Sequence, residues 1–413
     1  MIRINRHVFP NGLRLLHYHN ATTQMVALNV LYDVGARDEE PHHTGLAHLT
    51  EHLMFTGSRH APEFDVALER AGGSSNAGTT ADITHFYETL PAHNAETAFW
   101  LEADRMAHLT LSQRSIDTQK SVVIEEFKQR YLNAPYGDVS HLLLGLAYHV
   151  HPYRTPTIGE SPEHISHMPV DVIRRFYSSH YVPSNTILCV AGNISFDRAL
   201  SLTQKWFGSM PSAPKPVRNL TPEPPQTSER VMEVERYVPQ TAIFRAYRMC
   251  EATSPLYPAT DLITDVLANG KSSRFYQNVV TKTGLFTSLD ASVMGTLHPG
   301  LLLVTGHLAQ GASVAAAQQA IDNEIQELLE HGISQRELEK CVNKYASNLL
   351  FETEHYLKKA FRISMYELMG DADEFNRIVD RYRAVTPTHV LHTAQTVLAP
   401  ANCSTLIYRS SKR

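Results

Sequence analysis

Apolar and polar positions along the first half of the chain predict strands followed by helices. Residues 15–20 (LLHYHN) and 24–36 (QMVALNVLYDVGA) are rich in strand-forming residues and predict two strands. Residues 72–91 (GGSSNAGTTADITHFYETLP) carry small and β-branched residues and predict a hairpin that ends at a proline. Helices are expected over 94–111 and 112–132. Because strands and helices are grouped and do not alternate strictly, the pattern favours an α+β fold.

Two segments 217 residues apart look alike. The stretch YVPSNTILCVAG (181–192) has the same order of features as LAPANCSTLIYR (398–409): a proline, an asparagine and then an apolar run. Pro183 matches Pro400, and Asn185 matches Asn402. A helical pattern precedes each segment, so we expect a helix, a turn and a strand at both places. This repetition predicts two homologous domains.

A proline-rich stretch separates these halves. Residues 210–230 contain six prolines, which fix φ and remove hydrogen-bond donors, so we expect an extended linker there. The predicted organisation is an N-terminal domain over 1–212, a linker over 213–229 and a C-terminal domain over 230–413. A chain of 413 residues is long enough for two such domains.

Composition excludes several classes of function. The net charge is −5 and no basic run occurs, so a nucleic-acid surface is not expected. No apolar stretch reaches the roughly 20 residues needed to span a bilayer. The start MIRINRHVFPNG lacks the apolar segment of a signal peptide, so we expect a cytoplasmic protein, or a periplasmic one if a leader was removed.

The stretch LAHLTEHLMF (46–55) carries the candidate chemistry. On a helix, His48, Glu51 and His52 lie on one face because they are three and four residues apart. Two imidazoles one turn apart can both reach a zinc ion, and the glutamate beside them can take a proton from a zinc-bound water. This inverted HxxEH order occurs in zinc peptidases.

A catalytic zinc site usually has a third protein ligand. The helical stretch SVVIEEFKQR (121–130) carries two adjacent carboxylates, Glu125 and Glu126. These side chains differ by about 100° around a helix, so only one of them can face the metal. The spacing alone leaves both candidates open.

These residues resemble those of the pitrilysin/insulinase zinc metallopeptidases. The resemblance rests on FPNGLRLL, GARDE, GLAHLTEHLMFTGS, GGSSNAGTTADITHFY, VVIEE, the PSN turn and SSRFYQ, and it covers essentially the whole chain. It is strongest for the short bacterial processing-protease type. It implies two homologous domains that form half of a clamshell, each a mostly antiparallel sheet with helices packed on one face.

The resemblance also implies the roles of individual residues. Zinc, one ion per chain, would be held by His48, His52 and Glu126, with Glu51 as the catalytic base. In the second half the positions 217 residues on are occupied by Asp265, Ala268, Asn269 and Asn343, which do not form a zinc set. The C-terminal domain is therefore expected to close over the substrate without binding metal.

The resemblance suggests further roles around the metal. The substrate is expected to be an extended peptide that pairs with an edge strand containing Asn76 and Ala77. Asn76 could instead be a turn residue. Phe86, an aromatic on the same sheet, is also expected to contact the substrate, although it could equally belong to the core. Gln119 takes the place of a glutamate that the family often has beside the site.

One expected pair of residues is missing. Homologues with complete active sites often carry an arginine and a tyrosine seven residues apart, where this chain has Val280 and Thr287. We therefore expect a homodimer, or a heterodimer with a homologue that supplies the pair. The alternative function is a non-catalytic structural or assembly subunit of the same fold.

Overall fold

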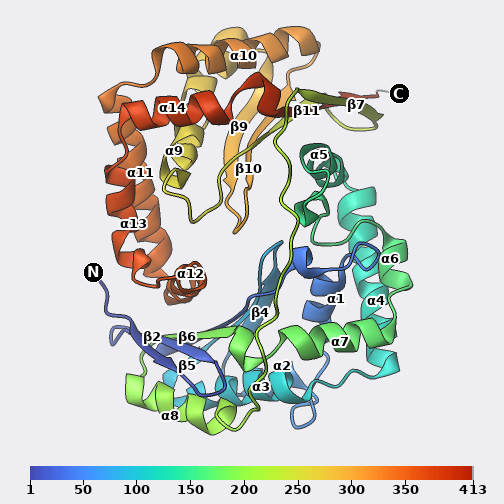
Figure 1. Cartoon of the computed structure of the whole chain (residues 1–413), viewed down its shortest axis with the longest axis vertical. Coiled ribbons are helices and arrows are strands. Elements are labelled where there is room, and N and C mark those ends of the chain that lie inside the picture. Colours follow the sequence, from blue (N-terminus) through green and yellow to red (C-terminus); the bar gives the residue numbers. More distant parts are fainter. Residues whose placement is uncertain (412–413) are drawn as a thin grey trace. The chain divides into compact units, whose positions relative to one another are not determined.

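The computed structural model describes residues 1–411 (Figure 1). Its contacts divide the chain into two compact units. The first unit comprises Met1–Gln129, Thr155–Leu220 and Leu349–Arg377. The second comprises Arg130–Arg154, Thr221–Asn348 and the residues from Ile378 onward.

The first unit contains a six-stranded sheet in the order β1-β2-β6-β3-β5-β4. Neighbouring strands are antiparallel, except for the parallel pair β2 and β6. The predicted strands and the predicted hairpin are present in it. The strands are β1 (Asn5–Val8), β2 (Arg14–His19), β3 (Met25–Tyr32), β4 (Ser74–Thr79), β5 (Thr84–Pro91) and β6 (Thr186–Gly192).

Helices cover both faces of this sheet. Side chains alternate along β3, so Val30 and Tyr32 face α3 (Ala95–His108), whereas Asn29 and Leu31 face α12 (Tyr356–Leu368). The first unit also contains α1 (Leu46–Leu53), α2 (Phe64–Arg70), α4 (Gln113–Phe127), α6 (Pro162–Ser166), α7 (Val170–His180) and α8 (Phe196–Phe207).

The second unit repeats this arrangement. Its sheet has the order β7-β11-β8-β10-β9, again antiparallel except for one parallel pair, β7 and β11. The strands are β7 (Arg230–Arg236), β8 (Ala242–Arg248), β9 (Phe286–Met294), β10 (Leu301–Leu308) and β11 (Cys403–Ser410). The helices are α5 (Val139–Ala147), α9 (Tyr257–Leu267), α10 (Val314–His331) and α14 (Pro387–Val397), while α11 (Gln335–Glu354) and α13 (Glu374–Arg383) run from one unit into the other.

The offset of 217 residues is maintained in the structure. It relates α7 to α14 and β6 to β11, and the sheets have equivalent strand orders. The expected α+β class and the two homologous domains are thus confirmed.

The same offset also relates α5 to α12, and these two helices are exchanged. Helix α12 comes from the C-terminal half but packs on β3 and β6, whereas α5 comes from the N-terminal half and packs on β8 and β11. The compact units therefore differ from the expected continuous domains, 1–212 and 230–413. Each sheet has its second face covered by a helix from the other half of the chain, which explains why β3 and β8 are buried on both faces.

The predicted linker, 213–229, has no regular structure along most of its length but is held at both ends. In its first part, Arg218 and Lys215 form ion pairs with Asp33 of the first unit, at 3.1 and 2.8 Å. In its second part, the Glu223 carboxylate accepts backbone N–H groups of residues 149–151 in the second unit, at 2.7–2.9 Å. Within residues 1–411, no helix is both long and apolar enough to cross a membrane.

The two repeated turns are held by equivalent asparagines. Asn185 donates from Nδ2 to the carbonyls of Asp33 and His180, at 3.0 and 2.9 Å. Asn402 donates from Nδ2 to the carbonyls of Arg248 and Val397, at 2.8 and 2.7 Å. Each side chain therefore ties the end of a helix to a neighbouring strand end.

Asn185→Ala should lower the free energy of unfolding by about 1–3 kcal/mol, because the substitution leaves buried carbonyls without their donor. Asn185 is fully buried. The measurement is the urea midpoint of the first unfolding transition. The exposed Asn133→Ala is the control and should change stability by no more than about 0.5 kcal/mol. Equal effects of the two substitutions would contradict the proposed role of the turn.

Candidate metal centre

Helix α1 is fixed at its N-terminus by a glycine and a carboxylate. Gly45 has φ of 85°, and a Cβ there would lie 2.7 Å from the carbonyl oxygen of Ile158, so only glycine fits. The Glu39 carboxylate accepts the N–H groups of Gly45 and Ala47, at 2.9 and 2.8 Å. Burial raises the pKa of Glu39 to about 8, although these hydrogen bonds oppose the shift.

Apolar residues of α1 orient its polar face. Leu46, Leu49 and Leu53 are buried and hold one side of the helix against the core. His48 and His52 consequently project together from another side, with 14% and 23% of their side chains exposed. Solvent and ligands can therefore reach both imidazoles.

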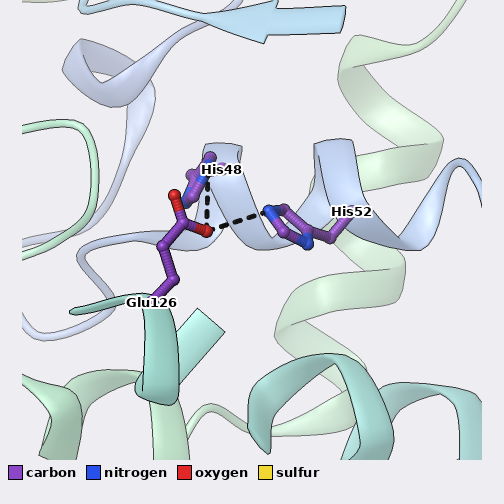
Figure 2. Close-up of side chains that lie close together, drawn as sticks. All are labelled: His48, His52 and Glu126. Carbon is purple, nitrogen blue, oxygen red and sulfur yellow. Dashed lines mark ion pairs between the residues drawn. The ribbon is translucent and has the colours of Figure 1, made fainter. Parts of the chain in front are cut away.

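The structure brings His48 and His52 together with Glu126. Figure 2 shows the two imidazoles from one turn of α1 and the glutamate pointing toward them from α4. Oε2 of Glu126 lies 3.9 Å from Nε2 of His48 and 3.4 Å from Nε2 of His52. One ligand atom from each of the three residues lies within 4.8 Å of the other two.

These three residues fit a zinc ion. Two imidazole nitrogens and one carboxylate oxygen form a known catalytic zinc set, which leaves a fourth position open. Such ligands bind at about 2.0–2.2 Å, so small side-chain movements bring the three atoms to one ion. The cluster therefore has the chemistry and the spacing of a metal site.

The two candidate glutamates lie on different sides of helix α4. Glu125 is exposed and forms an ion pair with Lys128 at 2.6 Å. Glu126 is half-buried and faces α1. Its neighbours on the helix, Val123 and Phe127, are buried, and they turn residue 126 rather than 125 toward the histidines. Of the two carboxylates left open by the spacing, the structure places Glu126 beside the imidazoles.

Glu126→Gln should abolish tight zinc binding at the site of His48 and His52, because an amide is a poor zinc ligand compared with a carboxylate. Glu125→Gln is a matched control on the neighbouring position and should retain the metal. The measurement is zinc per chain after dialysis against metal-free buffer. A zinc content in Glu126→Gln equal to that of the wild type, or a lower content in Glu125→Gln, would contradict the assignment.

Glu51 lies beside this cluster and interacts with the edge strand β4. Its Oε2 accepts a short hydrogen bond from the hydroxyl of Thr79. Burial raises the pKa of Glu51, and Glu126 adds to the rise, whereas Thr79 and His52 oppose it. A carboxylate with a raised pKa is a better proton acceptor than an exposed one.

Two residues that were expected to bind substrate, Ala77 and Phe86, lie on the sheet. Ala77 pairs with Phe86 across β4 and β5, so the two share the face that Thr79 presents to Glu51. Phe86 is fully buried between Tyr32 and Arg105, so its expected contact with substrate is corrected to a packing role.

Asn76 projects from the opposite face of β4. It is exposed, and its Oδ1 accepts the N–H of Ala77 at 2.8 Å. The alternation of side chains along a strand places it on the side away from Glu51. Gln119 is half-buried on α4, two turns before Glu126. Both remain candidates.

Two residues that position the site were not singled out in the sequence. Thr79 orients Glu51, and its only signal is a hydroxyl residue in the predicted edge strand. Glu39 caps α1, but it lies six residues before the glycine at the N-terminus of that helix. Capping patterns cannot be recognised in a sequence at that distance. Long-range contacts of this kind appear only in the folded chain.

In the second unit a lysine ammonium lies near the equivalent positions. Asn269 donates to Asp265, and Nζ of Lys344 donates to the side chain and, at 2.7 Å, to the carbonyl of Asn269. A lysine thus bonds to Asn269, which corresponds to His52, and Asn269 in turn bonds to Asp265, which corresponds to His48. Thr287 donates to the His307 carbonyl at 3.2 Å, and Val280 is half-buried, so neither offers the chemistry of the expected arginine and tyrosine.

Comparisons with known proteins identify the family of the chain. Residues 14–160 match the family model described as Insulinase (Peptidase family M16), and residues 167–345 match the one described as Peptidase M16 inactive domain. A Bacillus subtilis relative, named as the uncharacterized zinc protease YmxG, is 28% identical over 92% of both chains.

Solved structures share the fold over nearly the full chain. A protease from Helicobacter pylori superposes with a TM-score of 0.94 and 25% identity, covering 99% of this chain and 100% of that one. The periplasmic protease PqqL from Escherichia coli has a TM-score of 0.81 at 16% identity, and its likeness shows the fold alone. There the match covers 99% of this chain but 48% of PqqL.

The two family models together match more than three-quarters of the chain. The chain therefore belongs to peptidase family M16, the pitrilysin/insulinase family.

Proposed function

We propose that the chain is a zinc-dependent endopeptidase that hydrolyses extended peptides or unfolded segments. The observation that carries the proposal is the convergence of His48, His52 and Glu126, with Glu51 held beside them by Thr79. The names of relatives such as the zinc protease YmxG support the same reaction class.

A zinc ion held by these three residues would supply Lewis acidity, which polarises a peptide carbonyl and makes water a stronger acid. Glu51 then accepts a proton from the attacking water and returns it to the leaving amine. The hydrogen bond from Thr79 holds one oxygen of Glu51 in place, which leaves the other oxygen for this proton transfer.

The edge strand β4 supports the proposed substrate class. β4 is the last strand of its sheet, and no strand among residues 1–411 pairs with its outer side. An extended peptide can add to such an edge through main-chain hydrogen bonds. Thr79 lies at the end of β4 and contacts Glu51, so a peptide aligned there would pass close to the proposed base.

We also propose that the chain works as a dimer. Val280 and Thr287 occupy the positions where an arginine and a tyrosine are expected, and PqqL contains about twice the length of this chain. The partner would be a homologue that supplies the pair, or a second copy, in which case the reaction proceeds without the pair.

Turnover of a quenched peptide library, measured together with the zinc content, tests the proposed function. Zinc-loaded protein should cleave extended peptides alone or after a homologue that carries the arginine and tyrosine is added. A zinc-loaded chain that stays silent under both conditions would instead favour the non-catalytic structural subunit.

A further inference from the structure

A second group of possible metal ligands lies outside the site described above. It consists of His60, Asp104 and His108, and one ligand atom from each lies within 4.8 Å of the other two. None of these residues has a role in the proposed peptidase reaction. All three belong to the first unit.

Helix geometry and backbone pairing bring these residues together. Asp104 and His108 are four residues apart in the last turns of α3, so they share one face of the helix. His60 lies in the loop that follows α1. An isolated bridge between Ser58 and Leu109, and the hydrogen bond from Arg59 N to the His108 carbonyl at 3.0 Å, fasten this loop to the helix end.

The Asp104 carboxylate is held in one orientation. Oδ2 accepts the Ser58 hydroxyl and, at 2.9 Å, the backbone N–H of His60. Oδ1 lies 2.6 Å from Nδ1 of His60. Burial raises the pKa of Asp104, but the hydrogen bonds from Ser58 and His60 outweigh this effect and lower it, so the group is an anion at neutral pH. An oriented anionic oxygen is a good ligand for a cation.

The histidines leave this group open to solvent. The His60 side chain is 56% exposed, whereas that of Asp104 is 5% exposed. The rings of His60 and His108 lie 5.3 Å apart at 82°. The group therefore has a buried anionic base and two accessible imidazoles, which gives an ion a path of entry.

The electric field at the C-terminal end of α3 also favours a bound cation. Asp104 and His108 lie in its last two turns, where the aligned peptide dipoles place partial negative charge and favour cations. The aspartate and the helix end thus both attract positive charge at one place.

We propose that His60, Asp104 and His108 form a second binding site for a divalent metal ion of the zinc type. Two imidazoles and a carboxylate suit zinc and related transition metals better than Mg²⁺ or Ca²⁺, which prefer all-oxygen sites. When His60 Nδ1 and Asp104 Oδ1 both bind the ion, the imidazole carries its single proton on Nε2, so a proton on Nδ1 is exchanged to Nε2 through solvent and His60 stays neutral. The bound ion ties the loop after α1 to α3 and stabilises the first unit.

The test uses protein in which the proposed catalytic site cannot bind metal. A chain carrying His48→Ala and His52→Ala should still bind about one Zn²⁺ or Co²⁺ in the presence of excess Mg²⁺, and its Tm should rise on addition of the metal. Adding His60→Ala or His108→Ala should remove both the bound ion and the rise in Tm. His93→Ala, an exposed histidine in the same unit, is the matched control and should change neither.

A second measurement uses the wild type and single substitutions, so that misfolding of the multiply substituted chains cannot explain the result. Wild-type protein should bind two zinc ions per chain, and His108→Ala alone should bind one while its Tm without metal stays near that of the wild type. The proposal is overturned if the His48/His52 variant binds no ion, or if the second ion persists in both His60→Ala and His108→Ala. These results are independent of peptide cleavage, so they do not depend on the proposed peptidase function.

Discussion

Replacing Glu51 with glutamine should lower the rate of peptide cleavage by about 10²–10⁴-fold, because an amide cannot accept the proton of the attacking water. Zinc content should remain that of the wild type, since Glu51 is not among the three clustered ligand residues. The measurement is kcat/KM on a quenched peptide, paired with metal analysis of the same samples. Loss of activity without loss of metal separates the base from the ligands.

Glu125→Gln is the matched control for this experiment. It makes the same chemical change on an exposed carboxylate of the neighbouring helix and should leave both rate and metal unchanged. If Glu51→Gln cleaves as fast as the wild type, another group is the proton acceptor. If it loses zinc, Glu51 holds the metal and its role has to be reassigned.

Arg105→Met should destabilise the first unit by about 3–5 kcal/mol, because it leaves a buried charge without its partner. Arg105 is 1% exposed and is paired with the fully buried Glu88 and Glu102. Its guanidinium also lies over the ring of Phe86, 4.2 Å from the centroid. The measurement is the shift of the urea midpoint of the first unfolding transition.

Two further variants separate the charge effect from packing. Burial and the neighbouring Glu102 raise the pKa of Glu88 well above its ordinary value, which favours the uncharged acid at this position. Glu88→Gln, which resembles the protonated acid, should therefore lower the free energy of unfolding only slightly. Replacing Arg105, Glu102 and Glu88 together by apolar residues should recover much of the stability lost in Arg105→Met. Equal losses in the single and the triple variants would show that packing, not charge, holds this cluster.

Local patterns in the sequence correctly predicted α1, the helix that carries the candidate catalytic residues. His48, Glu51 and His52 are recognisable because helix geometry alone sets their common face. The choice of Glu126 over Glu125 needed the family resemblance, although Val123 three residues earlier marks the buried side of α4. The wrong expectation for Phe86 arose because a strand pattern does not tell which face is covered by helices.

Long-range features could not be predicted in this way. The exchange of α5 and α12 depends on which sheet each helix packs against, and the residues of neither helix specify that sheet. The capping of α1 by Glu39 and the contact of Thr79 with Glu51 likewise join residues from separate elements. Such contacts depend on tertiary packing, which periodicity does not encode.

The most direct test is the anomalous X-ray scattering of zinc in a crystal of the zinc-loaded protein. We expect a zinc peak at about 2.0–2.2 Å from the ligand atoms of His48, His52 and Glu126. A zinc-loaded crystal with no peak between these residues, and with Glu126 turned away from the imidazoles, would contradict this expectation.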